Sequence, residues 1–340
     1  MAEADQRGGL GEDGLIARYF APLARDFPGA FGLLDDAAVI APPDGEVLVV
    51  TTDALIAGVH FLPDDRPADI ACKALAVNVS DLAAKAAQPL AYSLALALPR
   101  GWREEWLAAF AEGLREAQAA FGIALCGGDT TVSPAGPLMV AITAFGSVPR
   151  GAMVRRGGAQ AGDCLYVSGT IGDAALGLKL RRGDADTQSC PLDDAARGTL
   201  IGRYLRPEPR LALREALLAH ASAAMDVSDG LVMDCARMCA ASGVGGRIEA
   251  SQVPLSAAAQ MLVASDRGAF ERALTGGDDY EILAAIRSGE GQAFGAAASA
   301  AGIRVTRIGT FSGNGASLSV IGANGSPIHF ATSGYDHMAS

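Results

Sequence analysis

The chain has 340 residues, a formal net charge of -11 and apolar side chains at 50% of its positions. This length predicts two domains, and the apolar content is sufficient to bury a sizeable core in each. The acidic balance argues against a nucleic-acid-binding protein, which would carry a basic patch or stripe. No apolar run approaches the ~18 residues that a membrane-spanning helix requires, so no membrane partner is expected.

The first residues and the cysteines favour a cytoplasmic location. Residues 1–10 lack the charged and then apolar pattern of a signal peptide, and we expect them to form a mobile tail. The six cysteines contain no Cys-x-x-Cys pair and lie at positions 72, 126, 164, 190, 235 and 239. This spacing fits neither a disulfide framework nor a zinc site, and it is typical of buried thiols in a reducing compartment.

The stretch from residue 34 to residue 53 combines two short apolar runs with acidic and hydroxyl side chains. Asp35 and Asp36 precede the first run, and the second run, Val47–Val50, ends in Thr51-Thr52-Asp53. Short β-branched runs bounded by turn residues predict strands. Polar oxygens at strand ends often build the sites of α/β proteins. Simple capping of a turn by the acidic pair is the alternative.

The rest of the first half predicts an α+β sheet with helices on one face, in the order β(β)αβαββ. Periodicity predicts helices at 11–27, 69–87 and 106–121, and strands at 90–98, 123–126 and 138–148. Asp69 is the expected N-cap of the second helix. Asn78 and Asp81 share a face of that helix, although Lys85, one turn further on, could pair with Asp81 as a surface partner.

A connector rich in glycine and arginine, residues 149–162, predicts the domain boundary. The predicted domains are therefore 1–148 and 149–340. The second half predicts a strand at 163–167, a surface loop at 181–197, a helix at 210–220 and a helix that ends at Gly243. Residues 78–82 resemble residues 226–230, which is a weak sign of internal pseudo-symmetry.

Aspartates beside glycine, serine or threonine recur at the ends of predicted elements: Asp36, Asp53, Asp81, Asp129, Asp226 and Asp229. Carboxylates that meet must be protonated or neutralised by cations, and hard oxygen ligands select Mg²⁺ or Ca²⁺. Mg²⁺ completes its shell with water and phosphates, and glycine beside Asp129 would admit a phosphate. No Walker A, GxSxG or HExxH motif occurs, no Rossmann fingerprint follows a predicted strand, and the histidines show no ligand spacing. A Mg²⁺–nucleotide site is therefore favoured over a purely structural distribution of aspartates.

A set of motifs then follows in order along nearly the whole chain: Gly11–Phe20, Asp35–Val39, Thr51–Asp53, Gly58–Phe61, Lys73–Ala84, Gly127–Thr131, Asp226–Gly230, Gly276–Glu281 and Gly334–His337. Each motif alone is weak, but together they resemble the thiamine-monophosphate kinase family. Its broader relatives are the aminoimidazole ribonucleotide synthetase-like ATP-binding proteins. The resemblance implies two α/β domains and a homodimer in which the N-terminal sheets complete a barrel across the interface.

The resemblance also implies an activity, the ATP-dependent phosphorylation of thiamine monophosphate to thiamine diphosphate. Carried over by matching position, the Mg²⁺ ligands are Asp36, Thr51, Thr52, Asp53, Asp81, Asp129, Asp226 and Asp229. The implied ATP contacts are Phe121, Gly128, Asp129, Arg156 and Ser228, and Arg155 is an alternative to Arg156. The implied contacts to the thiamine substrate are His60, Asp278 and Tyr335. No general base is assigned, because the acceptor is already an anionic phosphate oxygen.

Two departures from the family pattern affect local geometry. Leu34 stands where the family usually has glycine before the acidic pair, and Lys85-Ala86-Ala87 replaces the usual Met-Gly-Ala. Two other functions remain as alternatives: another ATP-using enzyme of the aminoimidazole ribonucleotide synthetase-like fold, and a non-catalytic nucleotide-binding or Ca²⁺-binding module. Selenophosphate synthetase, which has the same fold, is disfavoured. It uses an N-terminal cysteine or selenocysteine, and no cysteine precedes Cys72 in this chain.

Overall fold

The computed structural model describes residues 11–184, 192–313 and 315–335. The chain has a two-domain α/β fold and divides into two compact units. The first unit contains Met1–Leu82 and Ala87–Arg150, and the second contains Ala83–Ala86 and Gly151–Ser340. The predicted tail at residues 1–10 lies outside the described residues. Across the described ranges, no helix has the length and apolar content needed to cross a membrane.

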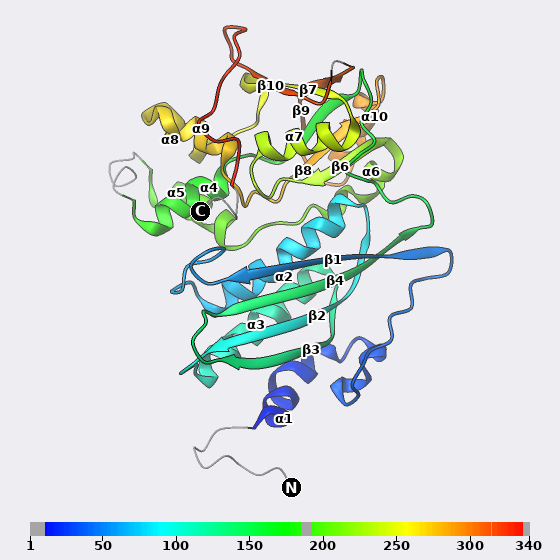
Figure 1. The fold of residues 1–340 in the computed structure, drawn as a ribbon, viewed down its shortest axis with the longest axis vertical. Helices are drawn as coiled ribbons and strands as arrows, with labels where there is room; N and C mark the ends of the chain where they lie inside the picture. The colour runs from blue at the N-terminus through cyan, green and yellow to red at the C-terminus, as the bar shows by residue number, and fades with distance from the viewer. Residues whose placement is uncertain (1–10, 185–191, 314, 336–340) are drawn as a thin grey trace. The chain divides into compact units, whose positions relative to one another are not determined.

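The first unit is built on a four-stranded mixed sheet in the order β1-β4-β2-β3. Its strands are β1 (Glu46–Ile56), β4 (Met139–Pro149), β2 (Gln88–Pro99) and β3 (Ala124–Ser133). β4 is antiparallel to both of its neighbours, whereas β2 and β3 are parallel. Two helices, α2 (Pro67–Ala84) and α3 (Glu104–Phe121), cover one face of the sheet, as predicted (Figure 1).

The segment before β1 differs from the prediction. The helix expected at 11–27 is a series of short helical turns: α1 (Glu12–Leu15), η1 (Ile16–Phe20) and η2 (Ala21–Ala24), followed by η3 (Pro28–Leu33). The strand expected directly after Asp36 does not form. The reason is local, because the N–H of Val39 donates to the carbonyl of Gly29 at 2.9 Å instead of pairing in the sheet.

The second unit contains a six-stranded sheet in the order β10-β7-β9-β5-β8-β6. Its strands are β10 (Leu318–Ile321), β7 (Gly245–Glu249), β9 (Val305–Ser312), β5 (Cys164–Ser168), β8 (Ile282–Ile286) and β6 (Ala221–Asp226). The pairs are antiparallel except β10 with β7. Its helices are α4 (Asp173–Arg182), α5 (Asp194–Leu205), α6 (Arg214–His220), α7 (Leu231–Ser242), α8 (Ala257–Ser265), α9 (Arg267–Thr275) and α10 (Gly291–Ala300), with η5 (Leu211–Leu213) and η6 (Ala250–Gln252).

Helices cover both faces of this second sheet. One buried apolar cluster joins the strands to α7, and a second joins the other face to α6, α10 and the last turn of α2. A third cluster joins α4, α5, α8 and α9. The thiols of Cys72, Cys126, Cys235 and Cys239 are buried and that of Cys164 is half-buried, while Cys190 lies outside the described residues.

Several predicted boundaries are wrong for identifiable reasons. Asp69 is not the N-cap of α2, because Pro67 begins the helix and Asp69 accepts a hydrogen bond from Arg66 Nε at 2.8 Å. The strand predicted at 123–126 is longer, because the glycine-rich motif at 127–131 is part of β3. The loop predicted at 181–197 is shorter, because Asp193 caps α5 by accepting from the N–H of Ala196. The predicted end of α7 at Gly243 is confirmed.

Helices α2 and α3 approach each other closely at Gly113. A Cβ at this position would lie 2.5 Å from both the Cα and the carbonyl oxygen of Ala68. Gly198, on the exposed side of α5, has open space around its would-be Cβ. Gly113 is therefore buried against α2, whereas Gly198 is exposed, and a side chain at each position would meet different surroundings.

We predict that Gly113→Ala lowers the free energy of unfolding by about 1–3 kcal/mol through overpacking. The matched control, Gly198→Ala, should instead stabilise the chain by about 0.5–1 kcal/mol, because alanine favours a helix over glycine. Thermal and urea unfolding followed by circular dichroism would measure both. Equal effects of the two substitutions would contradict the close packing of α2 against α3.

Candidate functional site

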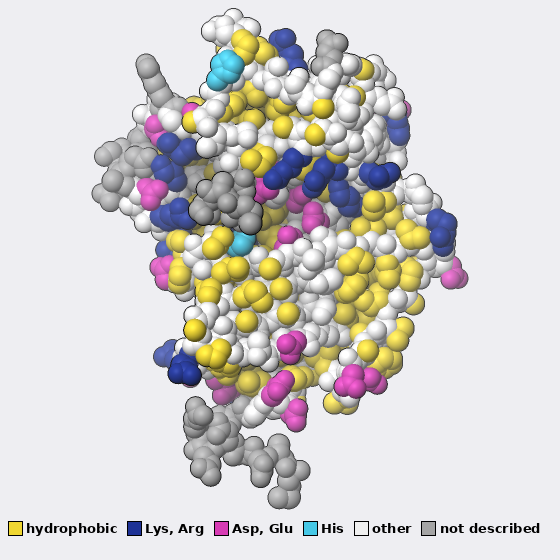
Figure 2. Space-filling view, in the orientation of Figure 1, with side chains coloured by type: hydrophobic (Ala, Val, Ile, Leu, Met, Phe, Trp, Pro, Cys, Tyr) yellow, Lys and Arg dark blue, Asp and Glu magenta, His cyan; other side chains and the backbone are white. Residues whose placement is uncertain are grey.

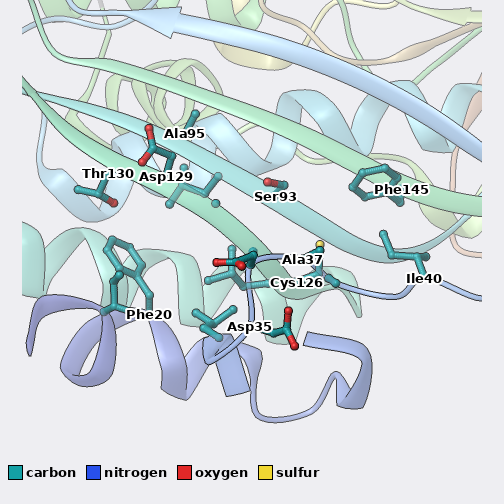
Figure 3. Close-up of a pocket in the computed structure, with 18 of the residues that line it drawn as sticks. Phe20, Asp35, Ala37, Ile40, Ser93, Ala95, Cys126, Asp129, Thr130 and Phe145 are labelled. Carbon is teal, nitrogen blue, oxygen red and sulfur yellow. The ribbon is translucent and has the colours of Figure 1, made fainter. Parts of the chain in front are cut away.

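A pocket of about 660 Å³ lies in the first unit, between the strands β2, β3 and β4 and the N-terminal helical turns (Figure 3). Its polar wall includes Asp35, Asp36, Ser93, Asp129 and Thr130. Its apolar lining includes Ile16, Phe20, Leu33, Leu125 and Phe145. A pocket that combines an apolar lining with grouped polar side chains is a usual form of a small-molecule site.

The two glycines of β3 play different parts in this wall. Gly128 pairs with Leu94 of β2, and a Cβ on Gly128 would lie 2.0 Å from the carbonyl oxygen of Leu94. Gly128 is therefore required for strand pairing. Gly127 also lines the pocket, but a Cβ there would meet nothing within 4 Å. Its missing side chain leaves pocket space open.

Strand β1 donates hydrogen bonds to polar side chains of helix α2. The hydroxyl of Thr51 donates to Asp81 Oδ2 at 2.5 Å, and the N–H of Asp53 donates to Asn78 Oδ1 at 3.1 Å. Thr52 turns to the other side of the strand, where its hydroxyl donates to the carbonyl of Ile142. The predicted shared face of Asn78 and Asp81 therefore points at β1, and Lys85 donates to the carbonyl of Ala224 at 2.8 Å.

His60 follows β1 in a tight turn that defines its tautomer. The N–H of Ile56 donates to His60 Nδ1 at 3.0 Å, so Nδ1 is an acceptor and the ring proton of the neutral imidazole is on Nε2. The buried ammonium of Lys73 donates to the carbonyl of His60 at 3.0 Å. These bonds fix both the backbone and the ring of His60.

In the second unit, the segment after β6 pairs with the loop before β8. The N–H of Asp278 donates to the carbonyl of Ser228, and the N–H of Tyr280 donates to the carbonyl of Val227, both at 2.8 Å. Asp278 (φ 74°) and Tyr280 (φ 50°) have left-handed backbones. Such conformations cost about 1–2 kcal/mol per non-glycine residue, so the surroundings must hold this loop in place.

Asp229 is paired in this structure. Its carboxylate accepts from Arg237, which also donates to Asp234 at 2.8 Å. Asp234 in turn accepts from the backbone N–H groups of Ser228 and Asp229. The N–H of Tyr335 donates to the carbonyl of Asp229 at 3.0 Å, so the C-terminal segment lies against the same turn.

The structure groups the predicted site residues unevenly. Asp36, Gly128 and Asp129 share the pocket, whereas Phe121, the last residue of α3, is not among the residues that line it. Ser228, Asp229, Asp278 and Tyr335 are neighbours in the second unit through their backbone bonds, and Asp226, buried, ends β6 beside them. Arg155 and Arg156 are both exposed.

In the part of the chain that the structure describes, no three or more His, Cys, Asp or Glu side chains form a ready metal site. Mg²⁺ does not need such a cage, because it binds through one or two carboxylates together with water and substrate phosphates. The oxygen donors present, a Thr51–Asp81 pair and the pocket carboxylates Asp36 and Asp129, have the chemistry that suits it.

Sequence reasoning missed a group of buried polar residues around the loop at 276–281. Burial raises the pKa of Asp279 well above its ordinary value, although its carboxylate accepts the N–H of Gly172 at 2.8 Å. Glu281 is fully buried against Arg203 and Arg210. Both acids stand in the Gly-Gly-Asp-Asp-Tyr-Glu motif, which was the available signal, but nothing marked the arginines.

Two family models match the chain: "AIR synthase related protein, N-terminal domain" over residues 34–148 and "AIR synthase related protein, C-terminal domain" over residues 160–321. Together these two matches cover most of the chain and show that it is an AIR synthase related protein. The thiamine-monophosphate kinase of Caulobacter vibrioides is 46% identical over 299 residues, which are 87% of this chain and 82% of that protein. The chain belongs to the thiamine-monophosphate kinase family.

Solved structures agree with this assignment. The crystal structure of thiamine-monophosphate kinase from Stenotrophomonas maltophilia K279a is 40% identical with a TM-score of 0.81, covering 92% of this chain and 96% of that chain. The structure of AaThiL complexed with AMPPCP and TMP is 29% identical with a TM-score of 0.75, covering 99% of each chain.

The raised pKa of Asp279 predicts a pH dependence of stability. A carboxyl whose folded pKa exceeds its unfolded value of about 3.9 favours folding most below that value, and this contribution is lost as the pH rises through the folded pKa. Relative to Asp279→Asn, the wild type should therefore lose stability as the pH rises above about 3.9 toward the raised folded pKa. Urea unfolding of both chains in steps of pH upward from about 4 would measure this loss, and a pH-independent difference between the chains would contradict it.

Proposed function

We propose that this chain transfers the γ-phosphoryl group of ATP to thiamine monophosphate and releases thiamine diphosphate and ADP. The supporting observation is that an acidic, glycine-lined pocket occurs in a chain that aligns over 99% of its length with AaThiL complexed with AMPPCP and TMP. AMPPCP is an ATP analogue, and TMP is read as thiamine monophosphate. The enzyme is thus a phosphotransferase whose acceptor is itself a phosphate group.

The pocket of the first unit is the proposed ATP site. Its apolar lining suits the adenine ring, and Gly127, Gly128 and Asp129 offer strand backbone and a carboxylate at the polar wall. Ser228 and Arg156 are proposed as further ATP contacts, with Arg155 as the alternative. Phe121 is proposed as a neighbour of the nucleotide that lies outside the pocket lining.

Mg²⁺ is the proposed metal. It would offset the negative charge of the ATP phosphates, which this acidic chain does little to neutralise by itself. The proposed ligands are Asp36, Thr51, Thr52, Asp53, Asp81, Asp129, Asp226 and Asp229. The short bond from Thr51 to Asp81 fits this role, because it holds two hard oxygen donors together. The hydroxyl of Thr52 is engaged with Ile142, which makes its ligand role the least supported of the set.

In the proposed reaction, the residues of this chain mainly position the substrates and compensate their charge. The acceptor oxygen of thiamine monophosphate is already anionic, so the reaction needs alignment and charge compensation more than a general base. His60 is held with its Nε2–H as a donor, which suits a hydrogen bond to the substrate. Asp278 and Tyr335 would face the cationic thiazolium, the aromatic ring by cation–π attraction.

The sheet of the first unit supports the proposed homodimer. In β1 the side chain of Thr51 faces α2. Side chains alternate along a strand, so Leu48 and Val50 face away from α2, and they are 38% and 57% exposed. Apolar side chains gather over this face (Figure 2). Pairing of two such sheets would bury them and complete the proposed barrel. Sedimentation equilibrium would test whether the chain is a dimer. We also propose a cytoplasmic location.

The direct test of function is incubation with ATP, Mg²⁺ and thiamine monophosphate, with thiamine diphosphate followed by chromatography. Product formation is expected. A chain that binds ATP but makes no thiamine diphosphate would overturn the proposal. ATP-dependent formation of aminoimidazole ribonucleotide, in a parallel incubation with its precursor in place of thiamine monophosphate, would favour the related synthetase. Nucleotide or Ca²⁺ binding without turnover would favour a non-catalytic module.

The metal assignment predicts that Asp81→Asn and Asp226→Asn each reduce kcat by more than about tenfold while the chain stays folded. The loss of one carboxylate charge is the physical reason. Asp44→Asn, an exposed turn residue of the first unit, is the matched control and should keep kcat. Near-wild-type turnover in both test variants would remove these two aspartates from the site.

The pocket assignment predicts that Gly127→Val raises KM for ATP by roughly tenfold or more, because the new side chain enters pocket space that no protein atom fills. The melting temperature should change little. Gly128→Ala is the contrasting variant, and it should lower the melting temperature because its Cβ overlaps Leu94. An unchanged KM for ATP in folded Gly127→Val would place the nucleotide elsewhere.

A further inference from the structure

A buried ion cluster anchors the loop that carries Asp278. Glu281 has no solvent exposure, and its carboxylate is fully engaged. Oε1 accepts from Arg203 at 2.8 Å and from Arg210 at 2.5 Å, and Oε2 accepts from Arg210 Nε at 2.7 Å and from the hydroxyl of Ser168 at 2.5 Å. The arginine side chains are only 12% and 17% exposed.

The surroundings are shaped around this carboxylate. Gly169 lies so close that a Cβ there would be 2.1 Å from Glu281 Oε1. A second acid, Glu208, pairs with both arginines at 3.1 Å, but its side chain is 63% exposed. Buried ion clusters contribute little net stability compared with apolar side chains of equal volume. Their better-supported role is to specify one arrangement of the chain, which for this cluster is the backbone of the loop that carries Asp278.

The cluster acts on the backbone of residues 278–281. Arg203 also donates to the carbonyl of Asp279 at 3.3 Å, and the carbonyl of Glu281 accepts the N–H of Val227 at 2.8 Å. Between these two anchors lies Tyr280, with its left-handed backbone, and directly before them lies Asp278, also left-handed. Left-handed backbones at non-glycine residues persist only where the surroundings over-determine them.

We propose that Glu281, with Arg203 and Arg210, is a positioning residue that holds Asp278 in its substrate-binding orientation and so sets affinity for the thiamine substrate. This inference rests on the proposed function, in which Asp278 contacts that substrate. Glu281 itself touches neither substrate in this scheme. It acts through the backbone of the loop, and the nucleotide pocket belongs to other residues.

The test uses the full chain and steady-state kinetics with each substrate varied in turn. Glu281→Gln keeps the size of the side chain and removes the charge that orients both arginines. KM for thiamine monophosphate should rise at least fivefold, while KM for ATP stays within twofold. Glu208→Gln is the matched control: it removes a carboxylate from the same two arginines without touching the loop, and it should leave both KM values unchanged.

A second pair of variants covers the case in which Glu281→Gln does not fold. Arg203→Ala should raise KM for thiamine monophosphate, and Arg203→Lys, which keeps the charge and a donor, should recover most of that loss. A folded Glu281→Gln chain with an unchanged KM for thiamine monophosphate would overturn the inference, as would equal increases in both KM values. A wild-type chain that makes no thiamine diphosphate would overturn the proposed function, and this inference with it.

Discussion

The parallel pairing of β2 with β3 is the constraint on which the candidate nucleotide pocket depends. Gly128 lies opposite Leu94, and only a residue without a side chain allows the two backbones to approach at this register. The same pairing places Asp129 and Thr130 in one wall with Ser93. The part of the polar wall formed by Ser93, Asp129 and Thr130 is therefore carried by strands that sheet hydrogen bonds fix, which holds these groups more precisely than a flexible loop would.

The carboxylates of this acidic chain have different hydrogen-bond and ion-pair partners, and these partners affect which carboxylates can bind a cation. Asp81 accepts from a neutral hydroxyl, that of Thr51, which leaves its negative charge able to attract a cation. Asp229 instead faces Arg237, so a Mg²⁺ ion at Asp229 would compete with a guanidinium already in place. Glu281 faces two arginines in the interior, an arrangement suited to fixing backbone rather than to binding an ion.

Sequence periodicity predicted the elements whose burial is regular. The helix that begins near Trp106 and the strand that begins near Leu90 were expected at their observed places, because their apolar residues repeat at helical and strand spacing. The run after Asp36 was predicted wrongly, because its backbone bonds within the N-terminal segment. The aspartates of the proposed site could be recognised from the residues next to them in the sequence. The partners of Glu281 could not, because Arg203 and Arg210 are more than 70 residues away along the chain.

The two departures from the family pattern have different physical consequences. Leu34 has φ -101° and ψ -3°, an ordinary right-handed backbone, so its turn needs no glycine; Phe31, Gly32 and Leu33 carry the left-handed conformations instead. Ala86 does occupy a left-handed position, with φ 55°, which costs about 1–2 kcal/mol. Its buried methyl offsets part of that cost, by about 0.8 kcal/mol. The second unit thus holds strained backbone at Ala86 by apolar packing, and at Tyr280 by a buried ion cluster.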